Sequence, residues 1–158
     1  MSEEKDQFAS LGLTRQFINA LEDKGYEKAT LIQQKAIPLI NAGHDILGIA
    51  PTGTGKTAAF VVPILQKLKY AQGMAPRAVI ISPSKELVMQ IHENIVQYAS
   101  YTDLRAVCIY GGIGPKTQIE ELAKGCDIIT STPAHFLELY KRGAFQSKMI
   151  KTMVLDDK

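Results

Sequence analysis

Residues 49–60 read IAPTGTGKTAAF, and this stretch decides which fold we expect the chain to adopt. The apolar run at residues 46–50 leads into it and a helical pattern follows it, so the glycines fall in a strand-to-helix turn. Gly53 and Gly55 allow backbone conformations that other residues avoid. The N–H groups of such a turn and of the helix start converge on an anion. In this context the pattern predicts a phosphate-binding loop.

The loop is predicted to contact a nucleotide through Pro51, Thr52, Gly53, Thr54, Gly55, Lys56 and Thr57. Lys56 adds a mobile point charge for the β- and γ-phosphates, and the Thr57 hydroxyl is placed to ligate Mg²⁺. The usual spacing is G-x-x-x-x-G-K-[ST], whereas Ala50 stands at the first glycine position here. The alternative is a glycine-rich turn with a chance Gly-Lys-Thr, which the strand before and the helix after disfavour.

Short apolar runs rich in Ile and Val recur along the chain, at residues 46–50, 78–82, 106–110, 127–131 and 152–156. They are mostly apolar rather than alternating, which is typical of strands buried on both faces. Helical patterns lie between them, at residues 86–100, 115–124 and 132–143. This alternation predicts an α/β fold with a parallel sheet flanked by helices. Two further helices are expected ahead of the sheet, at 14–23 and at 31–42, the second kinked or shortened by Pro38.

The composition, 46% hydrophobic and 22% charged over 158 residues, is that of one globular domain. The net charge of +2 by itself predicts no polyanionic partner, so a nucleic-acid site would have to be local. Nothing resembles a signal peptide, and no apolar run approaches the roughly 18 residues of a membrane span, so we expect no membrane partner. Cys108 and Cys126 are expected to be free thiols, which indicates a reducing, cytoplasmic compartment.

Further motifs accompany the loop in a fixed order: GYEKATLIQQKAIP (25–38), SPSKELVMQ (82–90), YGG (110–112), STPAHF (131–136) and VLDDK (154–158). With these motifs the chain resembles the N-terminal RecA-like domain of the DEAD-box RNA helicases, from Phe8 to the last residue. The resemblance implies a RecA-like P-loop three-layer fold, ATP and Mg²⁺ as cofactors, RNA as partner and RNA-dependent ATP hydrolysis as activity. It divides the chain into an N-terminal flank, 1–24, and a Q motif plus partial ATP-binding domain, 25–158.

The first of these motifs resembles the family's Q motif, which implies adenine recognition. Gln33 aligns with the residue that reads adenine, and a Gln amide can pair bidentately with adenine N6 and N7, as it does on DNA. Tyr26 aligns with the aromatic that stacks on the base, Phe8 with the isolated upstream aromatic, and Thr30 with a threonine that ties this segment to the phosphate loop. Without the resemblance, an amphipathic helix with exposed glutamines would be the preferred interpretation.

The next three motifs are implied to hold the RNA sugar-phosphate backbone through Pro83, Ser84, Lys85, Gly111, Gly112, Thr132, Pro133 and His135. Recognition would then be of shape and 2′-OH rather than of sequence. Lys85 and His135 stand where the family has arginine, so the bidentate fork is lost at the first position and full charge at the second. Ala134 stands where the family has glycine and adds a Cβ. These departures are expected to weaken RNA binding.

The last motif, VLDDK, aligns with the family's Val-Leu-Asp-Glu-Ala-Asp. Asp156 takes the place of the Asp that holds Mg²⁺ through its water shell, and Asp157 that of the Glu that activates the attacking water; with Lys56 these are the implied catalytic residues. Asp is one methylene shorter than Glu, and a displacement of about 1 Å at the reacting centre can cost on the order of a hundredfold in rate. We therefore expect ATP binding to be kept and hydrolysis to be weakened or lost. Pairing Asp157 with the family's first Asp is the alternative alignment.

The resemblance also implies that this fold is C-terminally incomplete, because the family domain continues and a second RecA-like domain supplies arginines to the ATP site. The chain alone is therefore expected to bind nucleotide without unwinding RNA. Two alternatives stay open: a catalytically weakened pseudo-helicase that acts as an ATP-gated RNA- or RNP-binding module, and an unrelated P-loop NTPase or kinase. The expected compartment is the cytoplasm, with the nucleus as the alternative in a eukaryote.

Overall fold

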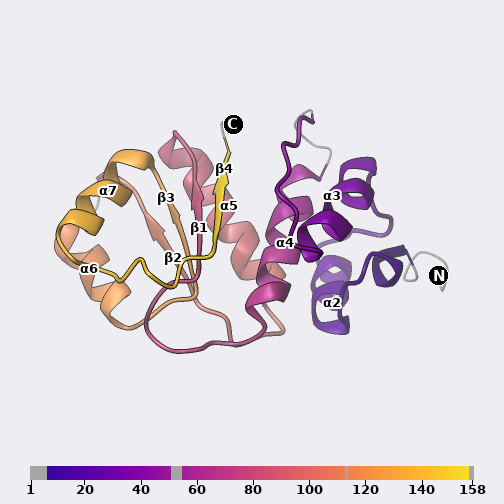
Figure 1. The fold of residues 1–158 in the computed structure, drawn as a ribbon, viewed down its shortest axis with the longest axis horizontal. Helices are drawn as coiled ribbons and strands as arrows, with labels where there is room; N and C mark the ends of the chain where they lie inside the picture. Colours follow the sequence, from indigo (N-terminus) through magenta and orange to yellow (C-terminus); the bar gives the residue numbers. More distant parts are fainter. Residues whose placement is uncertain (1–6, 51–54, 113, 157–158) are drawn as a thin grey trace. The chain divides into compact units, whose positions relative to one another are not determined.

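A computed structural model of the chain describes residues 7–50, 55–112 and 114–156 (Figure 1). Helices and strands follow one another in the order α2 (Arg15–Asp23), α3 (Leu31–Asn41), α4 (Lys56–Leu68), β1 (Ala78–Ile81), α5 (Lys85–Tyr98), β2 (Ala106–Ile109), α6 (Pro115–Ala123), β3 (Ile128–Ser131), α7 (Pro133–Lys141) and β4 (Thr152–Leu155). From β1 onward, strands and helices alternate, as the apolar runs predict.

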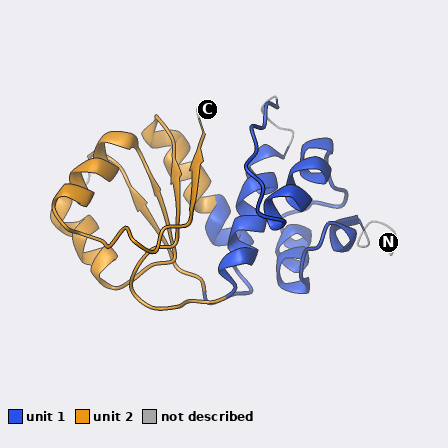
Figure 2. Cartoon of the chain, viewed as in Figure 1, with its two compact units in different colours: residues 1–69, 94–103 blue, residues 70–93, 104–158 orange. Residues whose placement is uncertain are grey.

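The chain forms two compact units, which Figure 2 colours blue and orange. Unit 1 consists of residues 1–69 and 94–103, and it contains the helices α2, α3 and α4. Unit 2 consists of residues 70–93 and 104–158, and it contains all four strands with α6 and α7. Helix α5 begins in unit 2 and ends in unit 1. None of the helices in the described part of the chain has the length and apolar character needed to cross a membrane.

The sheet of unit 2 has the strand order β2-β3-β1-β4, and every pair is parallel. Val79 of β1 pairs with Ile129 of β3 on one side and with Met153 of β4 on the other. Parallel neighbours need crossover connections, which the helices between the strands provide. Four of the five predicted strands are therefore confirmed, and the RecA-like α/β class with them.

The core of unit 2 lies where α6 and α7 cover one face of the sheet. It joins buried strand residues to Leu122 of α6, Leu139 of α7 and the following Phe145; the strand residues are Val79, Val107, Ile109 and Ile129. Each such side chain contributes roughly 1.5–3 kcal/mol when buried. On the opposite face, Cys108 of β2 contacts α5, with its Sγ 3.9 Å from the Val88 carbonyl oxygen. Helices thus lie on both faces of this sheet.

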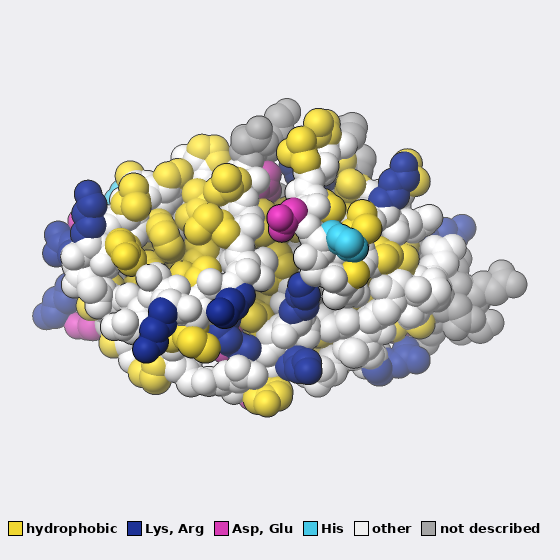
Figure 3. Space-filling view, in the orientation of Figure 1, with side chains coloured by type: hydrophobic (Ala, Val, Ile, Leu, Met, Phe, Trp, Pro, Cys, Tyr) yellow, Lys and Arg dark blue, Asp and Glu magenta, His cyan; other side chains and the backbone are white. Residues whose placement is uncertain are grey.

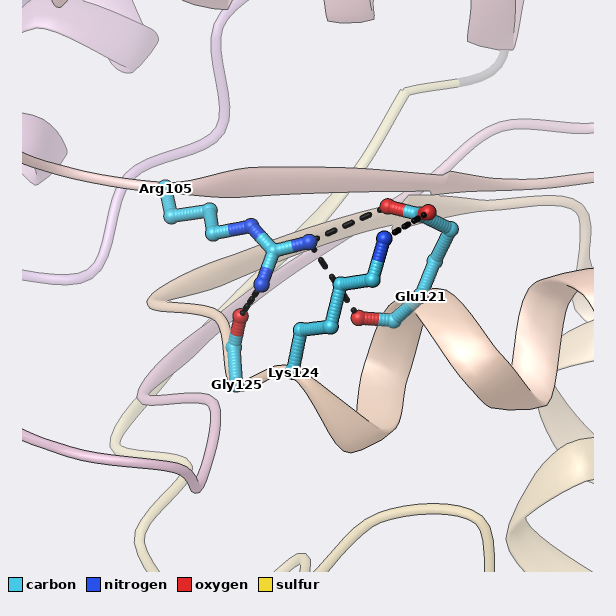
Figure 4. A network of polar contacts seen from close by, with 4 residues as sticks. All are labelled: Arg105, Glu121, Lys124 and Gly125. Atoms are coloured by element: carbon cyan, nitrogen blue, oxygen red, sulfur yellow. Dashed lines mark hydrogen bonds and ion pairs between the residues drawn. The ribbon is translucent and has the colours of Figure 1, made fainter.

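Charged side chains hold the amino ends of β1, β2 and β3 together through hydrogen bonds. Asp127, directly before β3, is 2% exposed and accepts hydrogen bonds from Arg77 Nη2 and from the Arg105 backbone N–H, both at 2.8 Å. Arg105 then reaches the end of α6, where it donates to the Gly125 carbonyl at 2.7 Å and to Glu121 Oε2 at 3.0 Å (Figure 4). A cation at a helix C-terminus satisfies carbonyls that have no partner within the helix. The amino edge of the sheet therefore has a structural role.

The predicted strand at residues 46–50 is wrong. The described sheet does not include this segment, and Leu47 and Ile49 are 89% and 88% exposed. An apolar run becomes a strand only where a neighbouring strand completes its hydrogen bonds and a core covers its side chains.

β4 is an outer strand of the described sheet, and its Met153 and Leu155 are exposed. Figure 3 shows hydrophobic side chains gathered over the strand-containing unit.

Pro38 does not end α3 early, because α3 runs to Asn41 with Pro38 inside. Proline removes one backbone donor, but the next bonds resume, since the Ala42 N–H donates to the Pro38 carbonyl at 3.0 Å. Buried Ala36 and Ile37 hold the helix within unit 1, where it packs against α4. Packing of this face outweighs the local preference of one residue.

Candidate functional site

The predicted phosphate loop comes directly before α4, which belongs to unit 1. Gly55 is the N-cap of α4, and its φ of 80° lies in the left-handed region that favours glycine. Lys56 and Thr57 form the first turn of α4, and both are half-buried. The start of this helix presents backbone N–H groups and the positive end of its dipole, which suit an anion. Pro51, Thr52, Gly53 and Thr54 lie outside the described residues.

Gln33 links the predicted Q-motif segment to Gly55. It is fully buried, and its Nε2 donates to the Gly55 carbonyl oxygen at 3.2 Å. Its Oε1 accepts from the Thr30 N–H at 3.0 Å, while the Thr30 Oγ1 accepts from the Gln33 N–H at 3.4 Å. Thr30 and Gln33 thus form a capping box at the start of α3. A Cβ on Gly55 would clash with Gln33 Nε2.

The structure therefore brings Thr30, Gln33 and Gly55 together. The Thr30-x-x-Gln33 spacing is a readable capping-box signature, whereas the bond to Gly55 carries no local sequence signal. Two further predicted nucleotide residues, Phe8 and Tyr26, also belong to unit 1. Phe8 is 2% exposed and belongs to its core. Tyr26 is half-buried and hydrogen-bonds to Tyr98, whose pKa is raised chiefly by burial and further by this bond.

In unit 2, three motif loops meet at the carboxyl edge of the sheet, since β1, β2 and β3 are parallel. They are cross-linked through the backbone: the Ser82 N–H donates to the Ser131 carbonyl at 3.0 Å, and the Thr132 N–H to the Ile109 carbonyl at 3.2 Å. Ser84 caps the start of α5, where its Oγ accepts from the Leu87 N–H at 3.2 Å. The loops are thus held by the sheet and by the helices that follow them.

The basic side chains of these loops lie against the glycines that follow β2. Lys85 Nζ lies over the Tyr110 ring, 5.3 Å from its centre, and 3.4 Å from where a Cβ on Gly112 would lie. His135 Cε1 lies 2.9 Å from the corresponding position on Gly111. The His135 Nδ1 is 3.3 Å from Thr132 Oγ1, and its Nε2 is 4.0 Å from Glu138 Oε2.

The predicted RNA-contacting residues of all three loops are therefore neighbours. Lys85, Gly111, Gly112, Thr132 and His135 make the contacts given above, and the exposed Pro83 and Pro133 flank Ser84 and Thr132. Pro133 is the first residue of α7, where proline's missing N–H has no helical partner to lose. The sequence analysis treated Tyr110 only as part of the YGG string and did not predict its contact with Lys85.

Asp156 directly follows β4 at the same carboxyl edge of unit 2. It is 6% exposed, and its backbone N–H donates to the Ile81 carbonyl at 2.9 Å. Asp157, the second predicted acid, lies outside the described residues. Among the residues that the structure describes, no group of three or more His, Cys, Asp or Glu side chains could hold a metal ion.

A parallel sheet with helices on both faces, motif loops at its carboxyl edge and a Gly-Lys-Thr helix start define a P-loop α/β domain of the RecA-like class. The family model described as DEAD/DEAH box helicase matches residues 30–158, so the chain belongs to that family.

The relatives given below are all named RNA helicases. The chain is 40% identical to the ATP-dependent RNA helicase drs1 of Schizosaccharomyces pombe, over 99% of this chain and 21% of that protein. It is 38% identical to the ATP-dependent RNA helicase DBP10 of Scheffersomyces stipitis, over 95% of this chain and 16% of that protein. The crystal structure of the RNA helicase Prp28 from Chaetomium thermophilum bound to ADP matches with a TM-score of 0.85 and 32% identity, over 92% of this chain and 37% of that one. The chain thus spans about a fifth or less of these two curated relatives.

Proposed function

We propose that the protein to which this chain belongs is an ATP-dependent RNA helicase, an RNA-dependent ATPase, and that this chain binds ATP and the RNA backbone. The observation that carries the proposal is the meeting of the loops after β1, β2 and β3 around Lys85, Gly111 and His135. Family membership and the names of the relatives support it.

The nucleotide half of the proposal assigns the phosphates to the loop at residues 51–57 and to the start of α4. Gly55 fits this role, because the space where its Cβ would lie is filled by the Gln33 amide, which keeps the backbone of the loop close to the Q-motif segment. Lys56 would neutralise phosphate charge. Gln33 and Tyr26 would form the adenine side of the site, as in a Q motif, and the buried Phe8 would support that side from the core.

Thr57 and Asp156 are the residues we propose for Mg²⁺, with Asp156 acting through water. Mg²⁺ keeps several water ligands in most proteins and takes oxygen ligands from the protein, so a hydroxyl and a carboxylate are each suitable for it. When bound, the ion neutralises charge on the phosphate oxygens. Asp157 would orient the attacking water and accept its proton.

The RNA half of the proposal assigns the sugar-phosphate backbone to the carboxyl edge of unit 2. Hydroxyls of Ser84 and Thr132, the starts of α5 and α7, and the Lys85 ammonium are all donors to phosphate oxygens. Glycine at 111 and 112 leaves room beside the backbone for the His135 and Lys85 side chains. None of these groups reads base edges, so binding is expected to be independent of sequence.

ATPase turnover of the full-length protein with saturating RNA tests this function. We expect RNA to stimulate turnover and Lys56→Ala to remove nucleotide binding. Preference for adenine nucleotides should be lost in Gln33→Ala. A preference for GTP, or the absence of any RNA effect on nucleotide binding or turnover, would contradict the proposal.

A second candidate is a pseudo-helicase that clamps RNA or an RNP when ATP is bound. Asp157 in place of Glu favours it, as do Ala134 and His135 in place of Gly and Arg. Comparing Asp157→Glu with the unaltered full-length protein separates the candidates. A rise of about a hundredfold in turnover in the variant supports the pseudo-helicase, while equal turnover supports the active helicase. Family membership disfavours the third reading, an unrelated P-loop NTPase.

We further propose that residues 1–158 alone do not unwind RNA, because a second RecA-like domain would complete the ATP site. Sites that lack an arginine finger lose on the order of 10³–10⁵ in turnover. A strong RNA-stimulated ATPase signal from residues 1–158 would overturn this.

We also propose a cytoplasmic location, or a nuclear one in a eukaryote. It is supported by the free thiols of Cys108 and Cys126, whose pKa values burial raises to about 11 and about 12.

A further inference from the structure

Lys85 and Tyr110 come from loops that follow different strands, yet their side chains meet. The Lys85 ammonium lies 5.3 Å from the centre of the Tyr110 ring, within the roughly 6 Å of a cation–π interaction. Lys85 is the first residue of α5 and is exposed, while Tyr110 directly follows β2 and is half-buried. The half-buried Tyr110 ring therefore provides a fixed surface against which the exposed Lys85 side chain lies.

Tyr110 is itself held by buried contacts. Its carbonyl oxygen accepts a hydrogen bond from Gln118 Nε2 at 2.8 Å, and Gln118 is only 4% exposed on α6. The residue before it, Ile109, is fully buried, and its carbonyl accepts from the Thr132 N–H at 3.2 Å. The backbone at Ile109 and Tyr110 is thus hydrogen-bonded both to α6 and to the loop after β3.

The two glycines that follow Tyr110 let the backbone approach the basic side chains. Gly112 has a φ of +94°, and a Cβ there would lie 3.4 Å from Lys85 Nζ. A Cβ on Gly111 would lie 2.9 Å from His135 Cε1. Lys85 and His135 are therefore both in contact range of one short segment of backbone, 111–112, and Tyr110 is the side chain that precedes it.

We propose that Tyr110 is a positioning residue that holds the Lys85 ammonium at the phosphate-binding edge of unit 2. The inference rests on the proposed binding of RNA backbone. A lysine side chain has many rotamers, and it loses this freedom when its ammonium binds a fixed phosphate. A lysine that already lies over a fixed ring loses less, so the ring strengthens the phosphate contact without touching RNA.

The test measures the affinity of the full-length protein for a labelled single-stranded oligouridylate, with a non-hydrolysable ATP analogue, over a series of salt concentrations. We expect Lys85→Ala to weaken binding and to lower the slope of log affinity against log salt by about 0.7, the share of one phosphate contact. Tyr110→Leu should weaken binding about two- to fivefold, the range of an exposed cation–π interaction. Tyr110→Phe keeps the ring and should bind as the unaltered protein does.

A double-mutant cycle separates positioning from a general structural effect. Tyr110→Leu should cause no further loss in the Lys85→Ala background. The upfield shift that the ring causes in the NMR signals of the Lys85 ε-methylene should vanish in Tyr110→Leu and remain in Tyr110→Phe, with or without RNA. Thermal unfolding identifies any variant that does not fold, and if Tyr110→Leu is one of them, Tyr110→Gln, which also removes the ring, takes its place in the cycle.

Several outcomes overturn the inference. If Lys85→Ala weakens RNA binding and Tyr110→Leu does not, the inference fails while the proposed RNA binding stands. An equal loss from Tyr110→Leu with and without Lys85 would show that the ring only supports the fold. If the unaltered protein binds no RNA, the proposed function and the inference fail together.

Discussion

Gln33 Nε2 donates a hydrogen bond to the carbonyl oxygen of Gly55, across 3.2 Å and 22 positions of sequence. The same side chain closes the capping box of α3 through Thr30. One buried amide therefore joins the start of α3 to the start of α4, and any ligand at the phosphate loop acts on a backbone that Gln33 already holds. Stability and nucleotide binding should both respond to changes here.

Gln33→Ala should lower the free energy of unfolding by about 1–3 kcal/mol, because the Gly55 carbonyl and the Thr30 N–H lose a buried partner. Urea unfolding measures the change. Gln34→Ala is the matched control: Gln34 is exposed and donates to the Ala29 carbonyl at 2.8 Å. Its loss should stay within about 1 kcal/mol, as for an ordinary hydrogen bond. Equal losses in the two variants would mean that the Gln33 bonds contribute nothing special.

Gly55→Ala should also destabilise unit 1, by about 1–3 kcal/mol, because a non-glycine residue is strained at a φ of +80° and the new Cβ would clash with Gln33. Gly114→Ala provides the comparison, since Gly114 has a φ of −58° and nothing lies within 4 Å of its Cβ position. Thermal unfolding of both variants tests this. A Gly55→Ala protein as stable as Gly114→Ala would contradict the described geometry of the loop.

Asp127→Ala should be among the most damaging substitutions in unit 2. Breaking a buried ion pair costs about 3–5 kcal/mol, because the remaining charge stays buried without its partner. Arg77 would lose this carboxylate, and the Arg105 N–H would lose its acceptor. Glu138→Ala removes a surface pair with Arg142 instead, and exposed pairs contribute about 0.2–1 kcal/mol. Urea unfolding should rank the two variants in this order, and the reverse order would refute the structural role of Asp127.

His92 should make stability depend on pH. Burial lowers its pKa in the folded protein, and the charge of Glu93 offsets this only in part. Between the lowered pKa and the unfolded value of about 6.5, the unfolded state binds more protons, so stability falls as pH drops below about 6.5 and is full above it. His92→Gln should flatten this part of the profile in urea unfolding. A profile that His92→Gln does not alter would show that other groups cause the dependence.

Local sequence was sufficient for most of the secondary structure. The runs that became β1 to β4 are short, apolar and β-branched, and the helices end where Gly125 and Gly143 take positive φ. It failed at residues 46–50, because an apolar run does not reveal whether a neighbouring strand exists to pair with it. It also allowed α3 to end early at Pro38, whereas the helix runs to Asn41 with Ala36 and Ile37 buried, and a propensity rule does not describe such packing.

The sequence by itself determined the alternation of strands and helices, the left-handed glycine before Lys56 and the motif strings that mark the family. These depend on neighbours within a few positions, where backbone sterics and side-chain periodicity act. Only the tertiary structure decided that Gln33 holds Gly55, that Asp127 joins Arg77 to Arg105, and that Lys85 lies over Tyr110. Each of these contacts joins residues that lie 22 to 50 positions apart in the sequence. Such contacts exist only because parallel pairing and helix packing bring distant segments together.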